Sequence, residues 1–298
     1  MYLNTLDVTL TPRTDEDLYN VQINAATLEI LSMILEFKVA ASWHISRFLT
    51  GKDQSKYVYT KLRRMWKAKL LESFKVYSGS LSGVPLFYML SKHGLRVLEQ
   101  HNAYRAEQLR SYPQAKTLLS WGLFKHEAQV VELASIEVKN KSVNFNIAFK
   151  GEISSQSLDS MNDKKIEALT PDYTALYTVA QTEHCIYTEF ERTAKSKEAM
   201  LRKIERYINY LDAEERKQKT LRLIFQTQGM EQSFWTNVLS NSPVALQKLR
   251  ILTTNLHLIQ DHTQFLEPIY LSDRTIKLKS NGQQKVDTSQ RIKLFSFL

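Results

Sequence analysis

Apolar residues recur at helical spacing in the first third of the chain, and this pattern predicts three helices. The helices cover residues 25–38, 43–51 and about 54–70. The apolar residues of the third helix share one face, so its polar residues gather on the opposite face. That polar face carries Lys56, Thr60, Arg63, Arg64 and Lys67.

Two runs typical of strands follow, LESFKVYS at 71–78 and PLFYMLS at 85–91, and a helix begins near Lys92. Small residues join the two runs, as at a hairpin tip. Three helices, a hairpin and a helix predict a winged helix-turn-helix over residues 1–100, with the third helix in a DNA major groove. The predicted DNA contacts are Lys56, Arg63, Arg64, Lys67 and Lys75. The alternative is a helical interaction domain whose charged face is only solvated.

The rest of the chain is predicted to form a helical connector over residues 101–124, a domain over 125–272 and a basic tail over 273–298. The predicted elements of the domain are a helix at 126–140, strands at 143–154, 171–179 and 185–192, a helix at 197–211, a strand at 221–228, a helix at 243–256 and a strand at 265–272. This order predicts a mixed sheet flanked by helices. For the tail, a flexible arm and a final docking hairpin both remain open.

Acidic residues lie on or next to several of the predicted strands. Since alternate residues of a strand face the same side, Glu189 and Glu191 share one face and repel each other without a cation. Asp172 and Glu152 from neighbouring strands would complete an oxygen-rich site. Such a site suits Mg²⁺ or Mn²⁺. The bound ion could activate a water molecule to attack a phosphodiester bond. The alternative is that these acids are solvated positions at strand ends.

The charge balance favours an anionic partner. There are 40 Lys and Arg against 31 Asp and Glu, a net charge of +9, and nucleic acid is the first expectation. The chain has one cysteine and no run of about 18 apolar residues, and it does not begin like a signal peptide. We therefore expect a cytoplasmic protein without disulfides or a membrane span.

Several segments resemble the replication-relaxation family of mobile genetic elements, to which MobC-type relaxases of mobilisable plasmids belong. The similar segments lie between residues 10 and about 225 and read LTPRTDEDL, HEAQVVELASIEV, GEI, PDYTAL and TEFERTAKSKEAMLRKIERYINY. Members join a winged helix to a nuclease-like domain of the PD-(D/E)xK type. The resemblance thus implies an α+β protein, with an N-terminal winged helix-turn-helix and a restriction-endonuclease-like α/β domain with a mixed sheet.

Carried over by position, the resemblance also implies site residues. The implied metal ligands are Glu152, Asp172, Glu189 and Glu191, and the implied catalytic residues are His126, Arg192 and Lys203. The common nuclease motif has a lysine at the position of Glu191. In this chain, Lys203 on the next helix could reach back to the site and supply the missing lysine. Where the family has Glu-x-Asp-Arg-Gly-Thr, this chain reads EFERT. The glycine is missing, and Glu191 replaces the aspartate, which keeps the negative charge but lengthens the side chain. His126 has a plainer alternative, as a histidine that caps a helix.

Two functions remain open from the sequence. One is a metal-dependent endonuclease, a relaxase-like nickase that recognises an origin of transfer or replication. The other is a catalytically inactive, sequence-specific DNA-binding accessory factor or transcriptional regulator for plasmid mobilisation. The expected partners are double-stranded DNA of the origin region and other mobilisation or relaxosome proteins, with a homodimer left open. No His-x-His pair of the tyrosine relaxases occurs, although Tyr207 and Tyr210 flank the predicted site.

Overall fold

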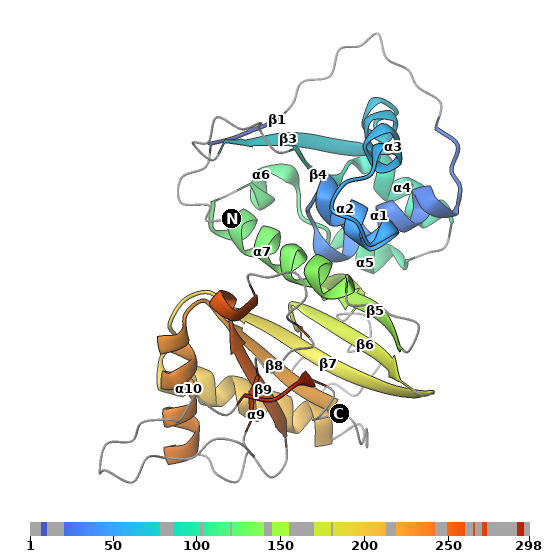
Figure 1. Cartoon of the computed structure of the whole chain (residues 1–298). Coiled ribbons are helices and arrows are strands. Elements are labelled where there is room, and N and C mark those ends of the chain that lie inside the picture. Colours follow the sequence, from blue (N-terminus) through green and yellow to red (C-terminus); the bar gives the residue numbers. More distant parts are fainter. Residues whose placement is uncertain are drawn as a thin grey trace. The chain divides into compact units, whose positions relative to one another are not determined.

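The computed structural model describes residues 7–10, 21–77, 86–101, 104–119, 121–139, 145–154, 170–179, 181–212, 219–241, 249–259, 265, 270–272 and 291–294. The chain divides into two compact units, Met1–Lys139 and Asn140–Leu298 (Figure 1). Each unit combines helices with a sheet. The protein is therefore of the predicted α+β class.

The first unit begins with the predicted series of helices and strands. In chain order its elements are β1 (Asp7–Leu10), α1 (Ala25–Phe37), β2 (Ala40–Ala41), α2 (Ser42–Thr50), α3 (Lys56–Lys67), β3 (Leu71–Tyr77), β4 (Leu86–Leu90) and α4 (Lys92–Gln100). The strands form a sheet of order β1-β3-β4-β2. Three helices followed by the β3–β4 hairpin are the order that the winged helix-turn-helix prediction requires. The predicted hairpin tip, residues 78–85, lies outside the described residues.

Local sequence accounts for where these helices begin and end. The side-chain oxygens of Asn24, Ser55 and Ser91 accept hydrogen bonds from first-turn amides of α1, α3 and α4. Gly51 ends α2 with a φ of 68°, a left-handed conformation that glycine adopts without strain. These residues therefore set where α1, α3 and α4 begin and where α2 ends.

Gly94 allows α4 to approach the chain between α3 and β3 closely. A Cβ atom at Gly94 would lie 2.3 Å from the carbonyl oxygen of Leu70, which is backbone and cannot rotate away. The same carbonyl accepts a hydrogen bond of 3.1 Å from the amide of Ser91, the residue that caps α4. Glycine is therefore required at this contact.

We expect Gly94→Ala to lower the free energy of unfolding of the first unit by about 1–3 kcal/mol, because the new methyl group forces a backbone shift. Urea unfolding followed by circular dichroism measures this change. Gly122→Ala is the matched control, since a Cβ there meets nothing within 4 Å. The helix propensity of alanine should make that control neutral or stabilising by up to about 1 kcal/mol. Equal destabilisation by both changes would contradict the steric argument.

The first unit also contains three further helices, α5 (Ala106–Arg110), α6 (Ala115–Leu118) and α7 (Trp121–Val138). The structure shows α7 packed against α1, α2, α6 and β2. Arg47 of α2 donates to Glu132 Oε1 of α7 at 2.8 Å, and His44 Nε2 lies 2.6 Å from Glu132 Oε2. By packing, α7 thus belongs to the first unit rather than to the sheet domain with which the sequence analysis grouped it.

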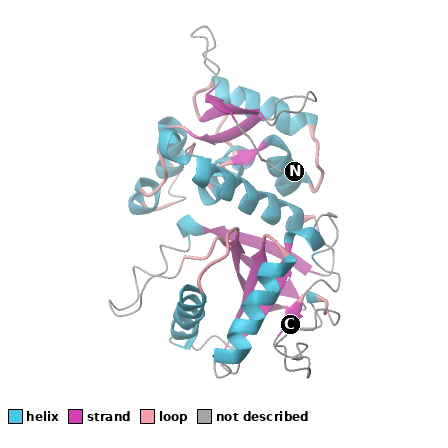
Figure 2. Cartoon of the chain, turned by 90° about the vertical axis from the view of Figure 1, so that its left-hand side faces the viewer, coloured by secondary structure: helices cyan, strands magenta, loops and turns pink. Residues whose placement is uncertain are grey.

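The second unit is built on a six-stranded mixed sheet. Its elements are β5 (Phe145–Gly151), β6 (Tyr173–Val179), β7 (Thr182–Glu191), α9 (Lys197–Asp212), β8 (Lys219–Phe225), α10 (Gln228–Asn241), β9 (Arg250–Asn255), the short 3₁₀ helix η1 (Leu256–Ile259) and β10 (Leu271–Ser272). The strand order is β10-β9-β8-β7-β6-β5. Strands β5, β6 and β7 are antiparallel neighbours, whereas β7, β8 and β9 run parallel. Helices α9 and α10 cover one face of this sheet (Figure 2).

Several predictions about this unit are wrong in detail. The helix predicted at 243–256 is instead strand β9 from Arg250 onward, while residues 242–248 lie outside the described part. Ile251, Thr253 and Thr254 are buried in that strand, where β-branched side chains pack well. The strand predicted at 143–154 ends at Gly151, and Glu152 belongs to a short helical segment. Helix α10 was not predicted.

Part of the C-terminal tail docks on the second unit. Tyr270 and Ile292 form an antiparallel bridge, and Leu294 is fully buried. Arg291 Nη2 donates to Glu231 Oε2 of α10 at 2.8 Å. For residues 291–294 the docking alternative is therefore correct. None of the helices among the described residues is long and apolar enough to cross a membrane.

Candidate functional site

Strands β6 and β7 bring three of the predicted acids, Asp172, Glu189 and Glu191, to one end of the sheet. Asp172 directly precedes β6, whose first residue, Tyr173, pairs with Thr188 of β7. Asp172 Oδ2 accepts a hydrogen bond of 2.6 Å from the amide of Phe190. This bond fixes the aspartate carboxyl against the neighbouring strand, next to the two glutamates.

Glu189 and Glu191 lie on the face of β7 that α9 covers. Tyr187 on the same face contacts Tyr207 of α9, with ring centroids 6.1 Å apart. The predicted alternation of β7 is therefore confirmed. The side chain of Glu189 is 11% exposed and that of Glu191 only 1%, so both carboxyl groups are withdrawn from water.

Lys203 reaches from α9 to both glutamates. Its Nζ donates to Glu189 Oε2 at 2.7 Å and to Glu191 Oε1 at 2.6 Å. The other oxygen of Glu191 lies 2.7 Å from Lys195 Nζ. The contact expected of Lys203 is thus present, and Lys195 is a second cation beside the acids.

Tyr207 completes the surroundings of Glu189. Its hydroxyl donates to Glu189 Oε1 at 2.7 Å, and its side chain is fully buried. Burial and the nearby charge of Glu189 raise the pKa of the Tyr207 hydroxyl well above its ordinary value. A hydroxyl that holds its proton so firmly is a poor nucleophile, which argues against a covalent tyrosine route through Tyr207.

The charges of this cluster influence each other strongly. Burial raises the pKa of Glu189 and the charge of Asp172 adds to this, while the ammonium group of Lys203 opposes it. Burial by itself would lower the pKa of Lys203, but the charges of Glu189 and Glu191 outweigh it and raise that pKa.

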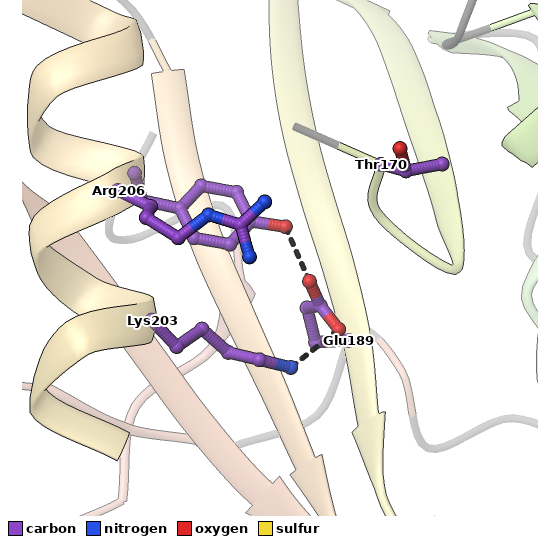
Figure 3. Close-up of a pocket in the computed structure, with 5 residues that line it drawn as sticks. Thr170, Glu189, Lys203 and Arg206 are labelled. Atoms are coloured by element: carbon purple, nitrogen blue, oxygen red, sulfur yellow. Dashed lines mark hydrogen bonds and ion pairs between the residues drawn. The ribbon is translucent and has the colours of Figure 1, made fainter. Parts of the chain in front are cut away.

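A pocket of about 290 Å³ opens beside the cluster. It is lined by Thr170, Glu189, Lys203, Arg206 and Tyr207. Figure 3 shows Lys203 and Arg206 extending from the same helix toward the strand that carries Glu189. Sequence analysis missed Arg206 and the role of Tyr207. Their spacing of three and four residues from Lys203 was the available signal, because such residues share a helix face.

The other predicted residues lie on other elements or just beyond the strand ends. Arg192 directly follows β7 and is half-buried. Glu152 lies after the end of β5, and His126 lies on α7 in the first unit. In the part of the chain that the structure describes, no three His, Cys, Asp or Glu side chains are grouped as metal ligands. The four predicted acids thus form no preassembled ligand set there, and the catalytic roles of Arg192 and His126 stay predictions.

Asp172 and Glu189 nevertheless have the chemistry that suits a hard divalent cation. Mg²⁺ is often held by one or two carboxylates, while water and phosphate oxygens complete its coordination. The charge of Asp172 contributes to the raised pKa of Glu189, as expected for carboxyl groups that lie near each other. These residues therefore fit a two-carboxylate site for Mg²⁺ or Mn²⁺ better than the four-acid set.

In the first unit, α3 presents the predicted basic face to solvent. Its apolar residues Val58, Leu62 and Met65 are fully buried. The opposite face contains five residues that are exposed or, for the last, half-buried: Lys56, Thr60, Arg63, Arg64 and Lys67. Lys75 is exposed on β3. The helix carries no acidic residue, so this surface is strongly positive.

Comparison with known proteins identifies the family. No curated protein matches the chain. The sequence model of the replication-relaxation family matches residues 31–224, more than half of the chain, and this span includes Asp172, Glu189 and Lys203. The match indicates a role in the replication or mobilisation of a plasmid or other mobile element. The chain therefore belongs to the replication-relaxation family, as its sequence resemblance predicted.

Proposed function

We propose that this protein binds double-stranded DNA at an origin of a mobile element through its first unit and nicks it, with Mg²⁺ or Mn²⁺, at the acidic cluster of its second unit. One observation carries the proposal. Lys203 reaches from α9 to Glu189 and Glu191, close to Asp172, which directly precedes β6. A pocket opens beside these residues. Carboxylates and a lysine at one place are the groups that metal-dependent phosphodiester cleavage uses.

Each group has a role that follows from its contacts. Asp172 and Glu189 would hold the metal ion, which when bound supplies a Lewis acid and lowers the pKa of a coordinated water. Lys203 places a positive charge at the pocket, where it can neutralise charge that develops on a phosphate. Glu191 acts as a positioning residue, because it binds Lys203 and Lys195 together.

DNA binding is assigned to α3 of the first unit. Lys56, Arg63, Arg64 and Lys67 lie on one side of this helix, away from its buried residues. Basic side chains gathered on one helix face bind phosphates, with an affinity that falls as salt rises. The proposed division of labour is thus recognition by the first unit and chemistry by the second. Other mobilisation proteins and a homodimer remain compatible with it.

A second candidate function rests on a different feature of the same cluster. Both oxygens of Glu189 and both oxygens of Glu191 already accept hydrogen bonds or ion pairs, from Lys203, Tyr207 and Lys195. A cation that binds Glu189 must compete with these donors. If Lys203 permanently takes the place of a metal ion, the protein is a DNA-binding accessory factor or regulator without nuclease activity.

A nicking assay separates the two candidates. Supercoiled plasmid carrying the DNA that flanks the gene for this protein is incubated with protein and Mg²⁺ or Mn²⁺. We expect wild type to produce open circles, and Asp172→Asn to nick at least about a hundredfold more slowly. Asparagine keeps a side-chain oxygen that can accept the Phe190 amide, so the fold is preserved. Arg63→Ala is the contrasting variant, expected to weaken DNA binding without removing the metal-binding carboxylates.

Binding of the flanking DNA without nicking, equal in wild type and Asp172→Asn, would overturn the nuclease proposal and support the accessory factor. Nicking by both proteins at equal rates would place the chemistry elsewhere in the chain. A mobility-shift measurement with the same DNA gives the binding half of the comparison.

A further inference from the structure

We infer that Tyr57 is a base-contacting residue that contributes sequence specificity when α3 binds the DNA major groove. This inference rests on the DNA binding proposed above and names a residue that neither the sequence analysis nor the family match assigns. Three features of α3 support it: the exposure of an aromatic ring, the distribution of charge along the helix, and the position of Tyr57 around the helix.

Tyr57 is unusually exposed for an aromatic residue on a short helix. Its relative exposure is 58%, the highest of the large hydrophobic residues exposed in the described part of the chain. Tyrosine ordinarily buries most of its ring, so a ring left in water on a charged surface suggests a partner that covers it. The hydroxyl provides a donor and an acceptor, and the ring edge provides apolar contact for a thymine methyl group.

The charge on α3 indicates what that partner is. Lys56 stands in the first turn, where the helix dipole disfavours a positive charge, and no acidic residue is present there to offset it. This arrangement destabilises the helix by itself, but it would be stabilised by an anion bound near the N-terminus of the helix. A phosphate backbone would relieve the repulsion at Lys56 and bind Arg63 and Arg64 on the same side. The occupant to which the inference commits is therefore duplex DNA.

The position of Tyr57 on the helix places it within the basic surface. At about 100° per residue, Tyr57 lies about 60° from Thr60, the centre of the polar face. Tyr59 is also exposed, at 44%, but lies about 100° from Thr60 on the other side of the helix. Of these two exposed tyrosines, Tyr57 therefore lies nearer the centre of the basic face.

Tyr57 and the basic residues then have different tasks. Phosphate contacts hold the protein on any duplex, whereas contacts to base edges distinguish one sequence from another. The basic residues of α3 provide the first kind of contact. Tyr57, uncharged and near the N-terminal end of the helix, provides the second kind.

The test uses the intact protein and a duplex that it selects itself. Randomised double-stranded DNA is selected with wild type, and the enriched duplex is compared with a scrambled duplex of the same composition. Fluorescence anisotropy gives the Kd of each for wild type, Tyr57→Ala, Tyr57→Phe and the matched control Tyr59→Ala. The salt dependence of binding is measured in parallel. Circular dichroism checks that the variants keep the helix content of wild type.

We expect Tyr57→Ala to weaken binding of the selected duplex by about tenfold to a hundredfold, the usual loss for one good base contact. Its Kd for the scrambled duplex and its salt dependence should match wild type. Tyr59→Ala should match wild type on both duplexes. Tyr57→Phe separates the two parts of the side chain: full binding assigns the contact to the ring, and a loss equal to that of alanine assigns it to the hydroxyl.

Two results would overturn the inference while leaving DNA binding intact: an equal loss on both duplexes for Tyr57→Ala, or no loss on either. If no duplex is enriched at all, the inference fails together with the DNA-binding half of the proposed function. The nicking assay is independent of this selection, so the two failures can be told apart.

Discussion

Lys203→Met is expected to destabilise the second unit by about 3–5 kcal/mol, the range found when one partner of a buried ion pair is removed. Glu191, with its side chain 1% exposed, would keep only Lys195, and Glu189 would keep only the hydroxyl of Tyr207. The chain has four tryptophans, of which only Trp235 lies in the second unit. Urea unfolding of 5-fluorotryptophan-labelled protein, followed by the ¹⁹F resonance of Trp235, measures the effect on this unit alone.

Divalent ions give the Lys203→Met variant a second readout that does not depend on activity. If Asp172 and Glu189 bind Mg²⁺ or Mn²⁺, removal of the competing ammonium group should strengthen binding. An ion at 100 times its Kd would then restore about 2.7 kcal/mol of stability. Wild type should gain less, and Asp172→Asn in the Lys203→Met background should gain almost nothing. No stabilisation of Lys203→Met by either ion would refute the metal site and favour the accessory function.

Lys197→Met is the matched control for both measurements. Lys197 is exposed at the start of the same helix, so its loss changes the net charge equally but leaves the buried acids paired. Its unfolding midpoint should stay close to that of wild type, with or without ions. If this control is destabilised as much as Lys203→Met, the cause is net charge rather than the buried pair.

Arg291→Ala is expected to have an effect of similar size, again about 3–5 kcal/mol, on the second unit. Glu231 is fully buried, and its carboxylate accepts hydrogen bonds of 2.8 Å from Thr253 and Asn255 as well as from Arg291. The two neutral donors would remain after the substitution, but the charge that balances the buried carboxylate would be lost. Trp235 is again the reporter, because its indole donates to Thr253 Oγ1 at 2.7 Å.

Two further variants test the cause of this effect. Combining Arg291→Ala with Glu231→Gln removes both charges and should recover part of the lost stability. Lys293→Ala changes an exposed residue of the same docked segment and should alter unfolding by less than about 0.5 kcal/mol. If Arg291→Ala unfolds like wild type, the C-terminal segment does not stabilise this unit in solution.

Several features could be predicted because they depend on local periodicity. The polar face of α3 follows from the 3.6-residue repeat of Val58, Leu62 and Met65, and the shared face of Glu189 and Glu191 follows from the two-residue repeat of a strand. Lys203 was not found by spacing. It came from the resemblance to the family, and the structure then gave it a partner in each glutamate.

Other features could not be predicted, because contacts distant in sequence decide them. Residues 243–256 show a helical pattern, although Ile251, Thr253 and Thr254 favour a strand, and residues 250–255 form β9 where β8 and β10 pair with them on both sides. The contact of Tyr207 with β7 is a similar case, because its hydroxyl donates to Glu189, a partner 18 residues away on another element.

The sequence by itself therefore determined the class of the protein, the order of helices and strands in the first unit, the basic face of α3 and the family. All of these follow from composition, from short-range repeats or from motifs contiguous in the chain. The tertiary structure alone decided that Tyr207 bonds to Glu189, that α7 packs with the first unit, and that Arg291 neutralises Glu231. Each of these contacts joins elements whose relative position is set by packing, and no local pattern in the sequence records it.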